Sequence, residues 1–162
     1  MNEDSDYILS KVRSFCAYQE RCISEVAGKL KVWKVGHNHA EKILEQLIRE
    51  DYLNEERFAR SFAGGKFRNN HWGKTKIICE LEKRQVPDLI IQIGLEEIDE
   101  EEYVETLKEL LKRKNREIRE TDPLKRKQKL IAYAMQKGYH YGLVKQEIGK
   151  QGSGEAGRRG SS

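Results

Sequence analysis

One short phrase occurs twice in the chain, and it constrains the fold more than any other feature of the sequence. The segment Leu53-Asn54-Glu55-Glu56-Arg57-Phe58 returns 45 positions later as Ile98-Asp99-Glu100-Glu101-Glu102-Tyr103. Each copy has an apolar residue, a polar residue suited to cap a helix, acidic residues for the first turn, and then an aromatic residue. Two such helix starts predict a repeated module of several short helices. Repeats of this size usually build binding surfaces rather than catalytic pockets.

The composition favours amphipathic helices. The 162 residues are 36% charged and 37% hydrophobic and include only two prolines. This mixture is typical of helices with solvated outer faces, and no segment has the alternation of a strand. The apolar content is low for one deep core, so we expect an all-α fold with several thin cores.

Charge is distributed in blocks although the net charge is only +4. Residues 57–84 hold eight basic and two acidic side chains, residues 96–105 hold seven acidic and no basic ones, and residues 108–129 hold ten basic and four acidic ones. Charge runs are usually solvated helix faces. Blocks of one sign also create local potentials that a polyanion or an acidic protein surface would feel.

Apolar periodicity predicts nine helices. The first three cover about residues 6–17, 20–33 and 40–48. Polar or proline residues then mark most of the later helix starts, at Asn54, Trp72-Gly73, Pro87, Asp99 and Asp122-Pro123. A ninth helix is expected at about 141–148. Gly138 follows the eighth helix, where a left-handed residue is wanted.

Gly64-Gly65 lies inside the pattern of the fourth helix, where each glycine costs roughly 1 kcal/mol relative to alanine. After this pair, Lys66 falls on the apolar face and Phe67 falls off it. We therefore expect the helix either to bend there or to change its packing partner.

The simplest domain organisation has three modules of three helices each. The expected boundaries are 1–53, 54–98 and 99–150, followed by a disordered tail at 151–162 that is rich in glycine and serine. We expect three tandem three-helix repeats in an elongated, solenoid-like crescent. A single compact helical bundle is the alternative.

Neither secretion nor a metal centre is indicated. Cys16, Cys22 and Cys79 lack CxxC spacing, which favours free thiols in a reducing compartment. No stretch approaches the ~20 apolar residues of a membrane span, and the acidic N-terminus has no signal-peptide core. The histidines show no spacing that completes a ligand set. We expect a cytoplasmic protein with no membrane association and no metal site.

Two neighbouring segments carry motifs that occur together in one known family. The first is Tyr52-Leu53-Asn54-Glu55-Glu56-Arg57-Phe58-Ala59-Arg60-Ser61-Phe62. The second contains Trp72-Gly73-Lys74, Lys76-Ile77, Glu80-Leu81, Lys83 and Gln85-Val86. The first resembles the "gyl-D/N-D/E-x-x-F-A" signature in the middle repeat of the RecX family. The second resembles the "kG-x-x-R/K-I-x-x-E-L-x-x-K-G-I" segment of that family. The resemblance extends from about Ile8 to Ile148.

This resemblance implies tandem three-helix repeats that bind along RecA recombinase filaments on DNA and inhibit or tune strand exchange and ATP hydrolysis. It implies a role in homologous recombination, DNA repair and the SOS response, with no catalytic activity and no cofactor. The expected partner is the RecA filament, and we also expect weak non-specific DNA binding by a monomer. The chain departs from the family at Gln85, where glycine is common, and at Gly64-Gly65. These departures leave the local geometry of the middle module open.

Basic residues in and beyond the two segments are the candidate contact residues. Arg57, Arg60 and Arg68 fall on the polar side of the fourth helix, and Lys76 and Lys83 share one side of the fifth. Our hypothesis is a basic ridge that clamps phosphates or pairs with acidic groups. The alternative is solvated cations without a partner. The full candidate set for contact with RecA or DNA is Arg57, Arg60, Arg68, Lys74, Lys76, Lys83, Lys112, Arg113, Arg116, Lys125, Arg126 and Lys127.

Aromatic residues near these cations admit two interpretations. Trp72 could stack on a partner or a base, but we favour a place in a core between modules. Tyr133, Tyr139 and Tyr141 are expected to pack within the last module, where one could also line a contact surface. Two other functions remain open: a helical nucleic-acid-binding protein with no recombinase partner, and a scaffold repeat.

Overall fold

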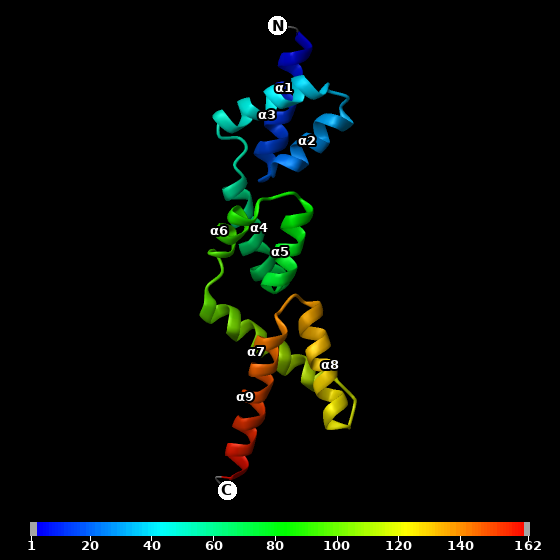
Figure 1. Cartoon of the computed structure of the whole chain (residues 1–162), viewed down its shortest axis with the longest axis vertical. Coiled ribbons are helices and arrows are strands. Elements are labelled where there is room, and N and C mark those ends of the chain that lie inside the picture. The colour runs from blue at the N-terminus through cyan, green and yellow to red at the C-terminus, as the bar shows by residue number, and fades with distance from the viewer. Residues whose placement is uncertain (1–2, 161–162) are drawn as a thin grey trace. The chain divides into compact units, whose positions relative to one another are not determined.

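The computed structural model describes the backbone of residues 3–160 and the side chains of residues 4–151. Within residues 3–160 it contains nine α-helices and no strand (Figure 1). The helices are α1 (Glu3–Tyr18), α2 (Ile23–Val32), α3 (His37–Arg49), α4 (Glu55–Asn70), α5 (Lys74–Lys83), α6 (Asp88–Leu95), α7 (Glu100–Glu117), α8 (Pro123–Gln136) and α9 (Tyr141–Gly160). The predicted all-α fold is confirmed for this part of the chain.

Three predicted caps begin helices as expected. The Asn54 side chain accepts a hydrogen bond from the backbone N–H of Arg57 at 2.9 Å. Asp99 accepts one from the N–H of Glu102 at 3.0 Å, and Asp122 accepts one from the N–H of Lys125 at 3.3 Å. Each cap satisfies an N–H that has no partner inside its helix. The two copies of the repeated phrase therefore start α4 and α7.

Left-handed residues end several of the helices. Gly138 follows α8 with φ of 105°, as predicted, and Gln85 follows α5 with φ of 62°. These two positions correspond in the second and third helix groups, since each lies four residues after a buried residue, Leu81 or Ala134. Gln85 therefore adopts the conformation that a glycine would take more readily.

Packing contacts divide the chain into two compact units. The N-terminal unit comprises the chain up to Gly64 together with Glu80–Glu97, and the C-terminal unit comprises Gly65–Cys79 together with the chain from Ile98 on. Both α4 and α5 thus contribute residues to each unit. The three-module organisation with boundaries after residues 53 and 98 stays a prediction.

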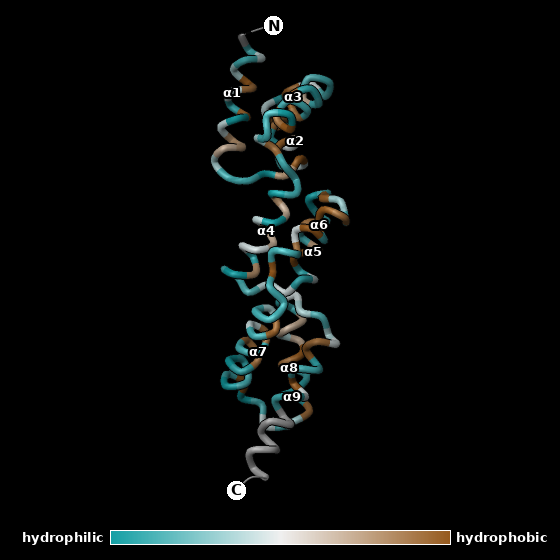
Figure 2. The backbone as a smooth tube through the Cα atoms, turned by 90° about the vertical axis from the view of Figure 1, so that its left-hand side faces the viewer, coloured by the Kyte–Doolittle hydropathy of each residue, from teal (hydrophilic) through white to brown (hydrophobic). Residues whose placement is uncertain are grey.

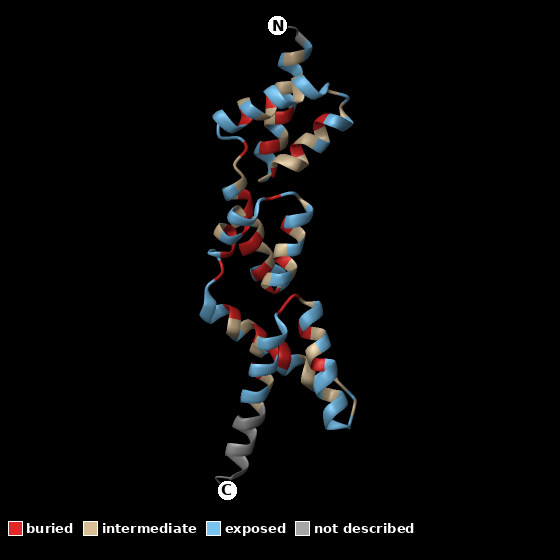
Figure 3. Cartoon of the chain, in the orientation of Figure 1, coloured by how far each residue is buried: buried red, intermediate tan, exposed pale blue. Residues whose placement is uncertain are grey.

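The N-terminal unit has a core built from α1, α2 and α3. Its buried members are Val12, Cys16, Val26, Leu30, Ile43, Leu47 and Leu53, which Figure 3 marks in red with the other buried residues. Elsewhere in this unit, α6 lies close against α4. A Cβ built on Gly94 would lie 2.8 Å from the backbone of Ala59, so only glycine permits this approach.

The C-terminal unit has a core between α7, α8 and α9. Its buried residues include Tyr103, Leu107 and Leu111 of α7, Leu130 and Ala134 of α8, and Tyr139 and Val144. Helices α7 and α8 lie side by side and form a hairpin whose tip is the loop 118–122 (Figure 1). In Figure 2 the tube of α7 is mostly hydrophilic, because its apolar residues are confined to one stripe.

The fourth helix changes its packing partner at the glycine pair. α4 is assigned without a break from Glu55 to Asn70. In its first half Phe58 contacts Phe62, and in its second half Phe67 contacts Tyr103 of α7 with ring centroids 5.7 Å apart. Phe67 is only 4% exposed because it packs against α7, so the predicted change of packing partner at the glycine pair is confirmed. The periodicity of the first half does not carry over, because the second half packs against a different helix.

The end of the chain differs from expectation in helix length. α9 was predicted to end at about residue 148 and is assigned to Gly160. Residues 161–162 and the side chains after Gln151 lie outside the described part, and the disordered tail at 151–162 stays a prediction. No helix among the described residues is long and apolar enough to span a membrane.

Candidate interaction surface

In the N-terminal unit, two arginines of the predicted ridge already have carboxylate partners. The Nε of Arg57 lies 2.6 Å from Glu20 Oε1, and its guanidinium also lies 3.1 Å from Asp51 Oδ1. The hydrogen bond to Glu20 raises the pKa of Arg57. Arg57 thus fastens the loop after α1 and the end of α3 to the start of α4.

Arg60 lies one turn further along α4 and has three acidic neighbours. Its guanidinium lies 3.3 Å from Glu56, 3.3 Å from Glu96 and 3.2 Å from Glu97. Part of the acidic block predicted from the sequence therefore lies against part of the basic block. The charge of Arg60 is compensated within the unit.

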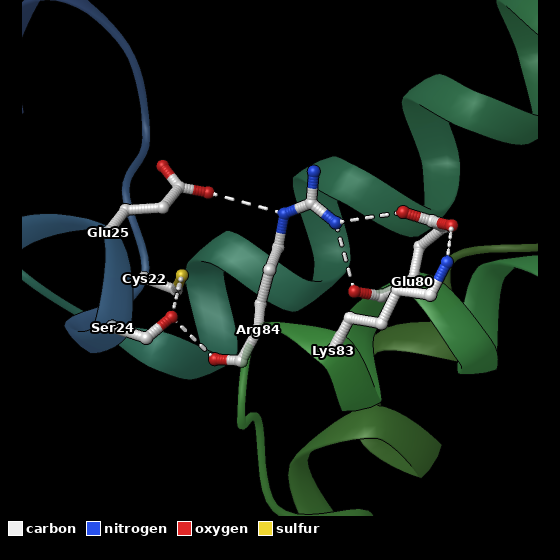
Figure 4. A network of polar contacts seen from close by, with 6 residues as sticks. All are labelled: Cys22, Ser24, Glu25, Glu80, Lys83 and Arg84. Carbon is white, nitrogen blue, oxygen red and sulfur yellow. Dashed lines mark hydrogen bonds and ion pairs between the residues drawn. The ribbon is translucent and has the colours of Figure 1, made fainter. Parts of the chain in front are cut away.

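Lys83 belongs to a polar network around Arg84 (Figure 4). Glu80 lies 3.0 Å from the Lys83 ammonium and 3.3 Å from the Arg84 guanidinium, and these hydrogen bonds lower the pKa of Glu80. Arg84 also lies 3.4 Å from Glu25 of α2, and its carbonyl accepts a hydrogen bond of 2.6 Å from Ser24. The network joins α2 to the end of α5, and the Lys83 charge has a carboxylate partner.

In the C-terminal unit, the turn before α5 packs directly against the turn between α8 and α9. The Gly73 N–H donates to the Lys137 carbonyl at 2.8 Å, and the Thr75 N–H donates to the Gly138 carbonyl at 3.0 Å. A Cβ on Gly138 would lie 2.8 Å from the backbone nitrogen of Lys76. This close approach brings Lys76 and Lys137 to the same place, although 61 positions separate them in the sequence.

Two buried tyrosines hold the same turn. The Tyr139 hydroxyl donates to the His71 carbonyl at 3.0 Å, and the Tyr103 hydroxyl accepts from the Lys74 N–H at 2.8 Å. The two rings contact each other with centroids 5.0 Å apart. Burial raises the pKa of both phenols above the ordinary value of 10.0. The predicted packing role of Tyr139 is confirmed, since Tyr139 is 1% exposed.

Lysines and aromatic rings alternate next to this turn. The Lys66 and Lys76 ammonium groups lie 4.9 and 4.5 Å from the centroid of the Trp72 ring. Lys76 shares a small pocket of about 210 Å³ with Tyr133, Gln136 and Lys137. The Lys114 ammonium lies 5.0 Å from the centroid of the Tyr133 ring. We name this set the basic–aromatic track, and its members are Lys66, Trp72, Lys76, Lys137, Tyr133 and Lys114.

Trp72, Tyr133 and Tyr141 are less deeply buried than Tyr139. Trp72 and Tyr133 are half-buried beside lysines, and Tyr141 is 47% exposed. The interpretation of Trp72 as a residue of a core between modules stays a prediction, since its side chain is neither fully buried nor exposed. Lys74 lies close by and pairs with Glu100.

The α7–α8 hairpin presents several exposed basic side chains. Arg113, Arg116, Lys125 and Lys127 are exposed. Within the part of the chain whose side chains are described, none of the four has a carboxylate within 4.0 Å, and the same is true of Arg68. Lys112 lies 3.8 Å from Glu109 and is more than half exposed. These side chains offer charge that the unit itself does not compensate.

Arg126 has a different position from its neighbours. Its guanidinium donates to the carbonyls of Ile118, Glu120 and Asn115 at 2.6–2.8 Å, and also to the Asn115 side chain at 2.6 Å. These bonds fasten the loop between α7 and α8. Arg126 therefore shapes the hairpin, and we no longer include it among the proposed contact residues.

The comparisons with known proteins identify the family. A family model for the second three-helix domain of RecX matches residues 54–95, and one for the third matches residues 100–148. A regulatory protein RecX of Clostridium acetobutylicum is 32% identical over 148 residues, which are 88% of this chain and 68% of that protein. The chain belongs to the RecX family. A regulatory protein RecX of Bacillus cereus is 28% identical over 138 residues, and there the match spans about half of the relative, 51%.

Solved RecX structures share the fold. The crystal structure of RecX from Lactobacillus salivarius has a TM-score of 0.84 and 20% identity over 93% of this chain and 97% of that one. A second crystal structure, of a regulatory protein RecX, has a TM-score of 0.81 and 21% identity over 89% of this chain and 71% of that one. At these identities the likeness concerns the fold alone.

The basic–aromatic track combines residues from both matched RecX domains. Lys66, Trp72 and Lys76 lie in the range of the second domain, and Lys114, Tyr133 and Lys137 lie in the range of the third. Sequence reasoning did not select Lys66, Lys114 or Lys137, because no spacing connects them to Lys76. The one available signal was the pair of glycines, Gly73 and Gly138, which permits the two turns to touch.

Among the described residues, no three histidine, cysteine, aspartate or glutamate side chains lie close enough together to hold a metal ion.

Proposed function

We propose that this chain binds RecA–DNA filaments and modulates the activity of the recombinase, as the RecX resemblance implies. Membership of a family whose relatives are named regulatory proteins supports a regulatory role. We further propose that the protein acts as a monomer in the cytoplasm and has no catalytic activity of its own. The free thiols of Cys16, Cys22 and Cys79 suit a reducing compartment.

The observation that carries this proposal is the uncompensated charge of the α7–α8 hairpin. Arg57, Arg60 and Lys83 have carboxylate partners in the N-terminal unit. By contrast, Arg113 and Arg116 have none among the residues with described side chains. An exposed cation without a partner in its own unit can pair with an acidic protein surface or a phosphate without first breaking an ion pair, and it gains a charge-assisted hydrogen bond. We therefore place the main contact on the hairpin and not on the predicted ridge.

The proposed mechanism is steric and electrostatic. Long-range attraction between the basic hairpin and an acidic filament surface would speed association. A helical protein seated in the groove of the filament would occupy the space needed by a second DNA molecule. Strand exchange would then be inhibited without any covalent step, and the degree of inhibition would follow occupancy of the filament.

The test is inhibition of strand exchange by charge-reversed variants. The Arg113→Glu/Arg116→Glu protein is expected to lose inhibition at concentrations where the parent inhibits fully, with normal thermal unfolding. The matched control is Lys42→Glu/Arg49→Glu, which makes the same charge change on the exposed face of α3. Equal inhibition by the hairpin variant and the parent would refute the hairpin as the contact.

The basic–aromatic track favours one second candidate function, a nucleic-acid-binding protein with no recombinase partner. Lysines that alternate with aromatic rings are typical of surfaces for single-stranded nucleic acid. The two functions differ in one observable. A RecA regulator binds the filament more tightly than it binds the same DNA, whereas a plain DNA-binding protein does not.

A further inference from the structure

We propose that the pocket formed by Lys76, Tyr133, Gln136 and Lys137 binds a backbone phosphate of single-stranded DNA, and that the rest of the basic–aromatic track guides the strand to it. This site goes beyond the proposed regulation of RecA, since it needs no recombinase. It also differs from the tip of the α7–α8 hairpin in the residues that form it.

The chemistry of the pocket fits a phosphate. The four residues that line it are two lysines, one tyrosine and one glutamine, and none of the four is acidic. All four side chains can donate hydrogen bonds, and a phosphodiester presents only acceptor oxygens. The volume of about 210 Å³ suits a small group rather than a whole nucleotide or a helix of a partner protein.

The fold fixes the two lysines next to each other. The Gly73 N–H binds the Lys137 carbonyl at 2.8 Å, and the backbone of Lys76 lies against Gly138. The like charges of two neighbouring lysine side chains repel each other. A bound anion would relieve that repulsion, whereas a second cation or an apolar ligand would not. The rigid turn thus gives a reason for an anion to be preferred here.

The surroundings of the pocket point to single-stranded DNA as the source of the phosphate. Lys76 of the pocket lies with Lys66 beside the Trp72 ring, and Tyr133 of the pocket lies beside Lys114. Lysine heads are flexible and can move from a ring to a neighbouring phosphate, which exposes the ring for stacking on a base. Only an unpaired strand offers repeated phosphates together with free base faces. An acidic protein surface would use the lysines but would give the rings no comparable role.

The first experiment measures binding of a labelled oligothymidylate by fluorescence anisotropy, with no recombinase present. Removal of two phosphate contacts by Lys76→Gln/Lys137→Gln should weaken binding by at least about tenfold and lower the slope of log affinity against log salt by about 1.4. The control Lys31→Gln/Lys42→Gln removes the same charge from exposed positions of the N-terminal unit and should change affinity less than about twofold.

A second variant guards against a folding artefact. Lys114 lies at the other end of the track and takes no part in the Gly73–Gly138 turn, so Lys114→Gln should keep normal unfolding and still weaken DNA binding.

In a Trp33→Phe background, Trp72 becomes the single indole, and its fluorescence should change during titration with the oligonucleotide. The change should be absent in Lys76→Gln/Lys137→Gln.

Three results would overturn this proposal. One is an equal loss of DNA affinity in Lys76→Gln/Lys137→Gln and in the control Lys31→Gln/Lys42→Gln, which would indicate electrostatic attraction by the whole protein rather than a binding site. Another is unchanged affinity in both track variants. The third is a polyglutamate peptide that binds as tightly as DNA and produces the same Trp72 signal. Failure of filament binding would leave these measurements untouched, because none of them contains RecA.

Discussion

Gly73 and Gly138 touch through their backbones, and neither position has room for a side chain. A Cβ on Gly73 would overlap the carbonyl of Gly138, and a Cβ on Gly138 would lie 2.8 Å from the backbone nitrogen of Lys76. Gly138 also has φ of 105°, which side chains rarely tolerate. This contact joins the start of α5 to the α8–α9 turn and places the two lysines of the proposed phosphate pocket.

Replacement of Gly138 by alanine should therefore destabilise the C-terminal unit by more than about 1 kcal/mol, since it adds both backbone strain and overlap. Urea unfolding followed by circular dichroism measures the loss. Gly149 provides the control, because a Cβ there meets nothing within 4 Å. If Gly138→Ala and Gly149→Ala unfolded at the same urea concentration, the close contact between Gly73 and Gly138 would contribute nothing to the free energy of unfolding.

Gln85 offers the opposite test. It has φ of 62° at the end of α5, where a side chain costs more than glycine does. We expect Gln85→Gly to stabilise the protein by about 0.5–1 kcal/mol. A fall in the unfolding midpoint would show that contacts of the Gln85 side chain outweigh the backbone strain.

Arg126 should matter for stability and not for contact with a partner. Arg126→Ala removes four hydrogen bonds that hold residues 115–120, and we expect a loss of about 1.5–3 kcal/mol. Hydrogen exchange should speed up in the loop 118–122. Lys125→Ala changes an exposed neighbour and should shift stability by no more than about 0.5 kcal/mol. Similar exchange in the two variants would contradict this structural role.

The buried phenols predict a loss of stability at alkaline pH. The pKa values of Tyr103 and Tyr139 lie above 10.0 in the folded protein. Above about pH 10 the unfolded chain therefore releases protons that the folded protein retains, so stability falls as pH rises. Urea unfolding at several pH values measures this slope, which Tyr139→Phe should reduce. The prediction would be contradicted if every tyrosine of the native protein ionised with the ordinary pKa of about 10.

Local signals in the sequence predicted the elements of the fold. Asn54, Asp99 and Asp122 were recognised as caps because a cap acts on an N–H only three residues away. Gly138 was recognised for the same kind of local reason. The partner that buries Phe67 could not be predicted, because it is Tyr103 of α7, which the periodicity of α4 does not contain.

The candidate surface was less accessible to sequence reasoning. Arg57 and Arg60 look like free cations in a basic block, but their partners Glu20, Glu96 and Glu97 lie 36 or 37 positions away. Lys137 has no sequence relation to Lys76 and reaches the same pocket only through the Gly73–Gly138 contact. Local spacing reports helices, whereas charge compensation and pockets arise from contacts between segments that lie far apart in the chain.

We propose that the recombinase filament, and not DNA alone, is the preferred partner of this chain. The most direct measurement compares the affinity of the protein for RecA filaments on single-stranded DNA with its affinity for the same DNA, at the same physiological salt. We predict tighter binding to the filament by at least about tenfold, a difference of about 1.4 kcal/mol. Arg113→Glu/Arg116→Glu should abolish most of that difference. Equal affinity for the filament and for the naked DNA would contradict the account and favour a plain DNA-binding protein.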